Sequence, residues 1–124
     1  MAAEMTVLNV DDYEAARYAK TRLLRNAGFR VIEASSGIEA LDMCSRLCPQ
    51  LVLLDVKLPD IDGREVCRRM KRDPATRDVR VVQTSAAYIS RADVASGLAS
   101  GADDYVTAPF EPRQLIVALR GPVQ

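Results

Sequence analysis

The stretch that decides the fold is Leu51-Val52-Leu53-Leu54-Asp55, an unbroken apolar run followed directly by an acid. A strand that is apolar at every position is typical of the centre of a parallel sheet, where helices bury both faces. In such sheets the functional crevice lies at the carboxyl ends of the strands. Asp55 follows the run at that end, so it is the first candidate functional residue.

Outward from this strand, strand-length apolar runs alternate with helical patterns five times along the chain. The expected strands are Met5–Val10, Phe29–Ala34, Leu51–Leu54, Val79–Thr84 and Asp104–Thr107. The expected helices cover about Glu14–Ala27, begin at Ser36 and Asp62, cover about Arg91–Ala99, and begin at Glu111-Pro112. This alternation predicts one α/β domain over residues 1–124, in which a doubly wound parallel sheet lies between two layers of helices.

The helix that follows Ser36 has a specific start signal. Ser36 and Glu39 stand at the spacing of a capping box, in which each side chain bonds the other residue's backbone N–H. Its apolar face is expected to contain Ile38, Leu41, Cys44 and Cys48. We interpret Cys44 and Cys48, four residues apart, as packing residues and not as a metal or redox pair.

Composition excludes several classes of function. Lys plus Arg and Asp plus Glu both number 17, so the formal net charge is zero and no nucleic-acid-binding surface is expected. The chain contains no histidine, which excludes Ser-His-Asp and Cys-His catalysis and most zinc sites. No apolar run approaches the roughly 20 residues that span a bilayer, and no signal-peptide pattern opens the chain. A cytoplasmic location and no membrane insertion are therefore expected.

Two further acids follow another strand. Asp11 and Asp12 come directly after the first expected strand, as Asp55 does after the central one. Because the carboxyl ends of parallel strands share one edge of the sheet, we expect these three carboxylates to converge. The pair Asp103-Asp104 instead precedes a strand. We therefore expect that pair at the opposite end, in a structural role.

Three converging carboxylates repel one another and resist joint ionisation. A hard divalent cation offsets this repulsion, and Mg²⁺ suits a few carboxylates with carbonyl and water ligands. An aspartate beside such an ion can itself attack a phosphoryl group, and Ser85 offers a hydroxyl at the same edge. The plainer alternatives are that Asp12 caps the first helix and that Ser85 is a turn residue.

Four segments, in this order and spacing, resemble the receiver domain of response regulators in two-component signalling, a CheY-like superfamily. They are Val10-Asp11-Asp12, Leu53–Gly63, Thr84-Ser85-Ala86 and Gly101–Phe110. The resemblance implies a flavodoxin-like fold with strand order 2-1-3-4-5. It also implies a phosphorelay function, in which a phosphoryl group passes from a phosphohistidine to the chain in a Mg²⁺-dependent reaction. Such a domain assists its own phosphorylation and dephosphorylation and is not an enzyme in the usual sense.

The resemblance assigns roles to individual residues of the acidic cluster. Asp55 matches the phosphoacceptor, and Asp12 matches the direct metal ligand. Asp11 matches the acid that holds the metal through water. The backbone carbonyl of Lys57 matches the third protein ligand.

The resemblance also implies a switch. Ser85 matches the hydroxyl residue that bonds the phosphoryl group, and Tyr105 matches the aromatic whose rotamer follows phosphorylation, although plain packing of Tyr105 is also open. Pro109 matches a proline preceded by a cis peptide bond. The expected partners are a sensor histidine kinase or histidine phosphotransfer protein and a downstream protein or output domain. The face formed by Arg91–Ala99, Asp104–Thr107 and the last helix would bind partners, including a second copy of the chain.

One position departs from the family pattern, because Ala108 stands where the family has a lysine. Three carboxylates, Mg²⁺ and that lysine would sum to zero charge, so its loss leaves the pocket at minus one. Attack by Asp55 is not removed, but stabilisation of the phosphorylated state is weakened. The alternatives are a natural variant, a deliberate alanine substitution, or a receiver that has lost phosphorylation, against which the retained acids argue. The side chain of Lys57 starts beside the site and offers partial rescue.

Two other classes of function stay open beside the phospho-switch. A constitutive protein-binding module of the same fold would keep the architecture and have weakened switching, with Ala108 as its mark. A haloacid-dehalogenase-type phosphatase also uses a nucleophilic aspartate after a strand, but it needs a second acid two residues later. That position is Lys57, which disfavours the phosphatase.

Overall fold

The computed structural model describes residues 5–85 and 90–121, and within them strands and helices alternate strictly. The strands are β1 (Thr6–Val10), β2 (Arg30–Ala34), β3 (Leu51–Asp55), β4 (Arg80–Ser85) and β5 (Asp104–Thr107). The helices are α1 (Glu14–Asn26), α2 (Gly37–Leu47), α3 (Gly63–Arg72), α4 (Arg91–Ala99) and α5 (Pro112–Arg120). The predicted element order is confirmed.

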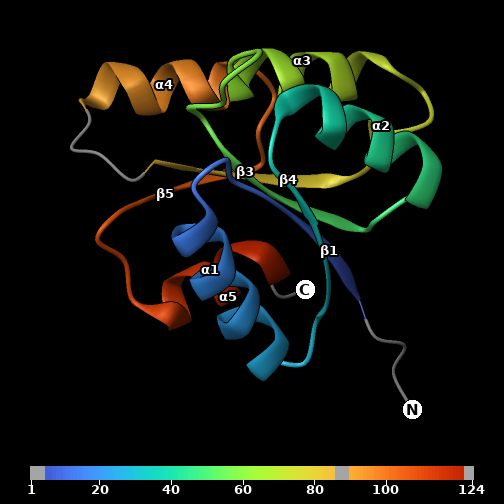
Figure 1. Cartoon of the computed structure of the whole chain (residues 1–124). Coiled ribbons are helices and arrows are strands. Elements are labelled where there is room, and N and C mark those ends of the chain that lie inside the picture. The colour runs from blue at the N-terminus through green and yellow to red at the C-terminus, as the bar shows by residue number, and fades with distance from the viewer. Residues whose placement is uncertain (1–4, 86–89, 122–124) are drawn as a thin grey trace.

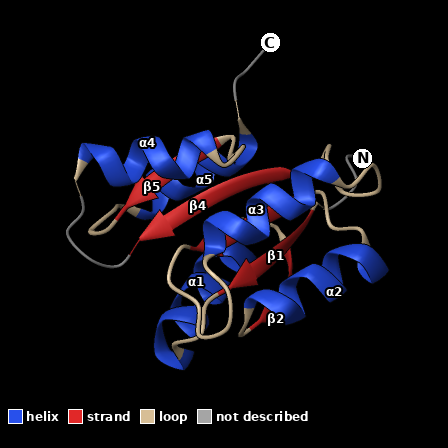
Figure 2. Ribbon diagram, turned by 90° about the horizontal axis from the view of Figure 1, so that it is seen from above, coloured by secondary structure: helices blue, strands red, loops and turns tan. Residues whose placement is uncertain are grey.

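The strands form one parallel sheet in the order β2-β1-β3-β4-β5, which confirms the expected topology. Helices α1 and α5 cover one face of the sheet, and α2, α3 and α4 cover the other (Figure 1). The strand arrows point in the same direction, so all carboxyl ends meet at one edge (Figure 2). That edge is where the candidate site residues are expected.

The central strand β3 connects the two layers of the core. Leu51 and Leu53 pack into the cluster that contains α1 and α5 residues, among them Leu24 and Leu115. Val52 and Leu54, at the alternate positions, pack into the cluster on the α2 and α3 side. Alternation of side chains along a strand explains this division. The expectation that the run is buried on both faces is confirmed.

The expected apolar face of α2 is partly wrong. Cys44 is buried, but Ile38 is 55% exposed and Cys48 is exposed. The inward position is Gly37, where a Cβ would come within 2.4 Å of the Ile61 side chain, and the next residue projects about 100° away around the helix. Cys48 lies beyond the last helical residue and adopts a left-handed conformation with φ 48°, which turns it out of the face.

The helix caps follow the sequence signals with one shift. Ser36 Oγ accepts from Glu39 N at 3.2 Å as expected, but the Glu39 carboxylate accepts from Ser35 N, one residue earlier than in a capping box. The strand β4 is also shifted, beginning at Arg80 and running through Ser85. It extends that far because Ser85 still pairs with Thr107 of β5.

Candidate functional site

The three predicted acids meet at the carboxyl edge of the sheet. The register aligns Val10 with Leu54, so Asp11 and Asp55 follow neighbouring positions on adjacent strands. One carboxylate oxygen of each of Asp11, Asp12 and Asp55 lies within 4.8 Å of the others. Asp11 is 3% exposed and Asp55 is 8% exposed, whereas Asp12 faces solvent. The predicted convergence is confirmed.

Asp11, and not Asp12, bonds the start of α1. The Asp11 Oδ1 atom accepts a hydrogen bond from Tyr13 N at 2.9 Å, and Tyr13 is the N-cap residue. The alternative that Asp12 caps this helix is therefore wrong. The Asp12 carboxylate is exposed, so its charge lies on the solvent side of the cluster.

The loop after β3 holds Asp55 in place through a close approach of the backbone. Gly63 N donates to Val56 O at 2.8 Å, and a Cβ on Gly63 would lie 2.3 Å from the carbonyl oxygen of Asp55. Only glycine allows α3 to begin this close to the acid. The Asp60 carboxylate accepts from Gly37 N at 2.8 Å, which ties the same loop to the start of α2.

A cavity of about 360 Å³ opens at this edge, and we call it the acid cavity. Its lining includes Asp11, Asp12, Asp55, Lys57, Leu58 and Ser85. Asp55 Oδ1 accepts from Lys57 N at 3.2 Å, so the Lys57 backbone is next to the Asp55 carboxylate, while Lys57 as a residue is exposed. The donor set of carboxylates and loop backbone fits a hard divalent cation such as Mg²⁺.

The electrostatics of the acid cavity favour binding a cation. The pKa of Asp55 is raised to about 6, first by burial and then by the charges of Asp11 and Asp12. The hydrogen bond from Lys57 N and the positive charge of Lys20 act in the opposite direction. Burial and the neighbouring carboxylates destabilise the ionised form of Asp55, so a bound cation would stabilise it.

Ser85 and Tyr105 lie on the neighbouring strands β4 and β5. Ser85 is 7% exposed and lines the acid cavity. Tyr105 is half-buried, and a Cβ on Gly97 of α4 would come within 2.6 Å of its ring. Burial raises the pKa of Tyr105, and a hydrogen bond with the Ser85 side chain lowers it. Tyr105 thus connects the serine of the cavity to helix α4.

The other acid pair lies where the sequence predicts, at the opposite end of the sheet. The Asp103 carboxylate accepts from Val81 N at 2.8 Å, near the start of β4, and pairs with Lys71 Nζ at 3.1 Å. The predicted structural role for Asp103 is confirmed. The peptide bond between Ala108 and Pro109 is cis, as expected.

Sequence reasoning missed Lys20, a residue of α1. Its Nζ atom lies 2.7 Å from Asp11 Oδ2, and the two side chains are 11% and 4% exposed. A second cavity of about 250 Å³, which we call the lysine cavity, is lined by Lys20, Ala108 and Asp55 among others. Ala16 and Lys20, four residues apart, share one face of α1, but only the packing of the helix turns that face toward Asp11.

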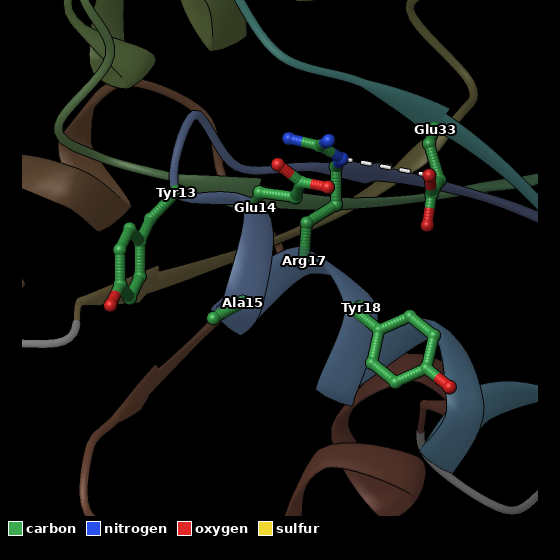
Figure 3. A pocket seen from close by; sticks show the side chains of 6 residues that line it. All are labelled: Tyr13, Glu14, Ala15, Arg17, Tyr18 and Glu33. Atoms are coloured by element: carbon green, nitrogen blue, oxygen red, sulfur yellow. Dashed lines mark ion pairs between the residues drawn. The ribbon is translucent and has the colours of Figure 1, made fainter.

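The outer side of α1 forms a shallow hollow beside the site, of about 500 Å³ (Figure 3). The exposed Tyr13 and Tyr18 side chains line it, and Arg17 reaches from α1 to Glu33 of β2 with a nitrogen–oxygen distance of 3.5 Å. Arg17 also donates to the carbonyl oxygen of Asp11 at 2.9 Å. These contacts fix α1 against β1 and β2.

Comparison with known proteins identifies the class. The family model of the response regulator receiver domain matches residues 7–120, and the chain belongs to that family. Among solved structures, the chain is similar to a protein described as a response regulator from Chloroflexus aurantiacus J-10-fl. The identity is 34%, the TM-score is 0.87, and 92% of this chain and 93% of that chain are covered. Chemotaxis protein CheY4 of Vibrio cholerae has 26% identity and a TM-score of 0.86 over 95% and 98% of the two chains.

Curated relatives extend beyond the matched region. Response regulator MprA of Mycobacterium leprae is 38% identical over 94% of this chain and 50% of its own length. The DNA-binding dual master transcriptional regulator RpaA of Synechocystis is 36% identical over 92% of this chain and 47% of its own length. The chain thus spans about half the length of the curated relatives it matches. Among the described residues, no helix is long and apolar enough to cross a membrane.

Proposed function

We propose that this receiver domain accepts a phosphoryl group on Asp55 in a Mg²⁺-dependent reaction. The observation that carries the proposal is the convergence of Asp11, Asp12 and the buried Asp55 within 4.8 Å at the edge of the acid cavity. A carboxylate oxygen of Asp55 forms the new O–P bond while the P–N bond to the donor imidazole breaks. The bonding electron pair stays on the imidazole nitrogen, which takes up a proton.

The residues around Asp55 have different roles in binding the metal and the phosphoryl group. Asp12 is exposed and would hold the metal directly, whereas Asp11 already accepts a hydrogen bond from Tyr13 N and pairs with Lys20, and would hold it through water. The Lys57 carbonyl would be the third protein ligand. Bound Mg²⁺ would neutralise charge on the transferring group. Ser85 lines the same cavity and donates its hydroxyl to a phosphoryl oxygen.

In this proposal Tyr105 transmits the effect of phosphorylation from Ser85 to helix α4. Its side chain contacts Ser85 on one side and lies against Gly97 of α4 on the other. A phosphoryl group that draws the Ser85 hydroxyl toward itself removes a bond from Tyr105, and its ring can then move relative to α4. The face of α4, β5 and α5 would change its affinity for a downstream protein, an output domain or a second copy of the chain.

The phosphodonor would be a sensor histidine kinase or a histidine phosphotransfer protein in the cytoplasm. DNA binding is stated for whole relatives such as RpaA, of which this chain spans about half. The formal net charge of this chain is zero, which does not favour direct contact with a phosphate backbone. We therefore propose protein partners, not nucleic acid, for this domain.

A second candidate, a receiver-fold module that binds its partner constitutively, is favoured by one observation. Ala108 lines the lysine cavity where the family places an ammonium. In that case the domain would bind its partner with the same affinity with and without a phosphodonor. Comparison of partner affinity in the two states separates the candidates.

Intact-mass spectrometry with a small phosphodonor such as acetyl phosphate tests the proposal. We expect one phosphoryl addition in the presence of Mg²⁺ and none when a chelator has removed divalent cations. Equal addition in the chelated sample would contradict the metal dependence. Failure to add any phosphoryl group with Mg²⁺ present would contradict the phosphoacceptor function and support the constitutive module.

A further inference from the structure

Lys20 is a largely buried lysine whose only role above is to pair with Asp11. Lysine side chains are rarely buried without a partner. Here the Lys20 ammonium pairs with Asp11 at 2.7 Å, and only 11% of its side chain is exposed. An ammonium has three donors, so this contact leaves donors for another acceptor.

The lysine cavity gives this ammonium room to reach Asp55. It is bounded on one side by α1 and on the other by the carboxyl ends of β3 and β4 and by residues that follow β5, with Asp55, Ser85 and Ala108 in its lining. Ala108 N donates to Ser85 O at 2.9 Å, which holds Ala108 against the end of β4. The small side chains of Ala16 and Ala19 leave the α1 side open.

The net charge of the three carboxylates and a bound divalent cation favours an ammonium beside Asp55. Three carboxylates carry one negative charge more than a divalent cation cancels, and Lys20 balances it. Phosphorylation adds a further negative charge at Asp55, because an acyl phosphate dianion replaces a carboxylate. The positive charge of Lys20 already acts at this point, since it lowers the pKa of Asp55.

The backbone around Lys20 is held in a fixed position. The buried Asn9 side chain of β1 donates to Arg17 O and to Thr21 Oγ1, both at 3.0 Å. The Thr21 hydroxyl in turn donates to Glu33 of β2. Lys20 lies between these two anchored residues of α1, so its side chain enters the cavity from a rigid base.

Resting on the proposed function, we propose that Lys20 is the cation that contacts a phosphoryl oxygen on Asp55. It supplies from α1 the ammonium that residue 108 lacks, and it shares its donors between Asp11 and the phosphoryl group. Lys57, the lysine that the sequence suggested for this role, is exposed. The missing ammonium at position 108 is therefore replaced from a different element of the fold.

Titration with beryllofluoride at saturating Mg²⁺, followed by amide NMR shifts near Thr84, tests the proposal. The key variant is Lys20→Met, which removes the charge and keeps a long apolar chain. The matched control is Lys71→Met, because Lys71 pairs with Asp103 at the opposite end of the sheet. The double variant Lys20→Met with Ala108→Lys returns an ammonium from the other wall of the cavity.

We expect Lys20→Met to weaken beryllofluoride binding by about tenfold or more, as a lost charge-assisted hydrogen bond does. Lys71→Met should leave the affinity within about twofold, and the double variant should recover most of the loss. Mg²⁺ titration of Lys20→Met alone should show equal or stronger binding, because Asp11 loses a competing cation. A merely structural role for Lys20 would not weaken beryllofluoride binding while leaving Mg²⁺ binding equal or stronger.

Unchanged beryllofluoride affinity in Lys20→Met would overturn the proposal, and so would a double variant as weak as Lys20→Met. If Lys20→Met does not give a folded amide spectrum, Lys20→Gln replaces it with the same expected outcomes. Absence of beryllofluoride binding and of phosphoryl addition in the unaltered chain would instead overturn the proposed function. The two failures are therefore distinguishable.

Discussion

The two ends of the sheet each contain an aspartate paired with a lysine, but they differ in the balance of charge around the pair. At the amino end, Asp103 is bonded by Lys71 and by Val81 N, and Lys71 also donates to Val79 O at 2.7 Å. Acceptors and donors there satisfy one another within the fold. At the carboxyl end, one lysine faces three carboxylates that lie within 4.8 Å.

The difference shows that an acid–lysine pair does not by itself mark a binding site. The surplus of negative charge at the carboxyl end is what favours a cation. A bound cation, together with Lys20, would in turn favour a phosphoryl group. Burial strengthens the effect, because the Lys20–Asp11 side chains are 11% and 4% exposed and the Lys71–Asp103 side chains are 21% and 35% exposed. Electrostatic interactions grow as water is excluded.

The most direct test of this difference is to substitute one aspartate at each end of the sheet. Asp55→Asn should abolish phosphoryl addition from acetyl phosphate, because it removes the nucleophilic oxygen. Asp103→Asn should leave the addition complete, because Asp103 lies at the opposite end of the sheet. Intact-mass spectrometry of both variants reads the result. A full addition to Asp55→Asn would refute the assignment of the acceptor.

A glycine at each end offers a test of backbone packing. Gly63→Ala should cost about 3 kcal/mol or more of unfolding free energy, because its Cβ would lie 2.3 Å from the Asp55 carbonyl oxygen. Gly101→Ala should cost less, about 1–2 kcal/mol for a left-handed alanine at φ +106°, because its Cβ would meet only the Lys71 side chain, at 2.9 Å, and no backbone atom. Urea unfolding measures both, and equal losses would contradict the close approach at Asp55.

The raised pKa of Asp55 predicts a pH-dependent gain in stability for Asp55→Asn in metal-free buffer. The folded-state pKa of about 6 lies above the ordinary 3.8, so ionisation of Asp55 destabilises the fold as the pH rises through this window. Removing the charge should therefore raise the unfolding free energy by about 2–3 kcal/mol at pH 7. The gain should fall to about 0.5 kcal/mol at pH 4, near the ordinary pKa, and vanish at lower pH, where Asp55 is protonated in both states.

Urea unfolding at pH 7 and pH 4 in the presence of a chelator checks this expectation. Asp103→Asn serves as the control and should lose stability at pH 7, because it weakens the contact with Lys71. A destabilised Asp55→Asn at pH 7 would show that the carboxylate is already compensated without metal.

The smallest expected effect separates the two acids that follow β1. Asp12→Ala should weaken Mg²⁺ binding about tenfold more than Asp11→Ala, because Asp11 is engaged by Tyr13 N and Lys20. Asp103→Ala should leave Mg²⁺ affinity nearly unchanged. Isothermal titration calorimetry measures all three. Equal losses in Asp11→Ala and Asp12→Ala would contradict the division of roles between them.

Residues at strand ends were predictable from the sequence, and residues on helix faces were less so. Asp11, Asp12 and Asp55 follow strands whose direction the βα alternation sets, so their meeting required no knowledge of packing. Ile38 and Cys48 were placed wrongly, because the phase of α2 depends on the close contact at Gly37 and on the point where the helix ends. Lys20 was missed for the same reason, since only the packing of α1 turns it toward Asp11.

Localisation of the phosphoryl group tests the central claim most directly. Borohydride reduces an aspartyl phosphate to homoserine, and peptide mass spectrometry then shows which residue carried the phosphoryl group. After treatment with acetyl phosphate and Mg²⁺, we predict homoserine at position 55 and aspartate at positions 11, 12 and 103. Homoserine at any of those three positions, with Asp55 unaltered, would contradict the claim that Asp55 is the phosphoacceptor of this receiver domain.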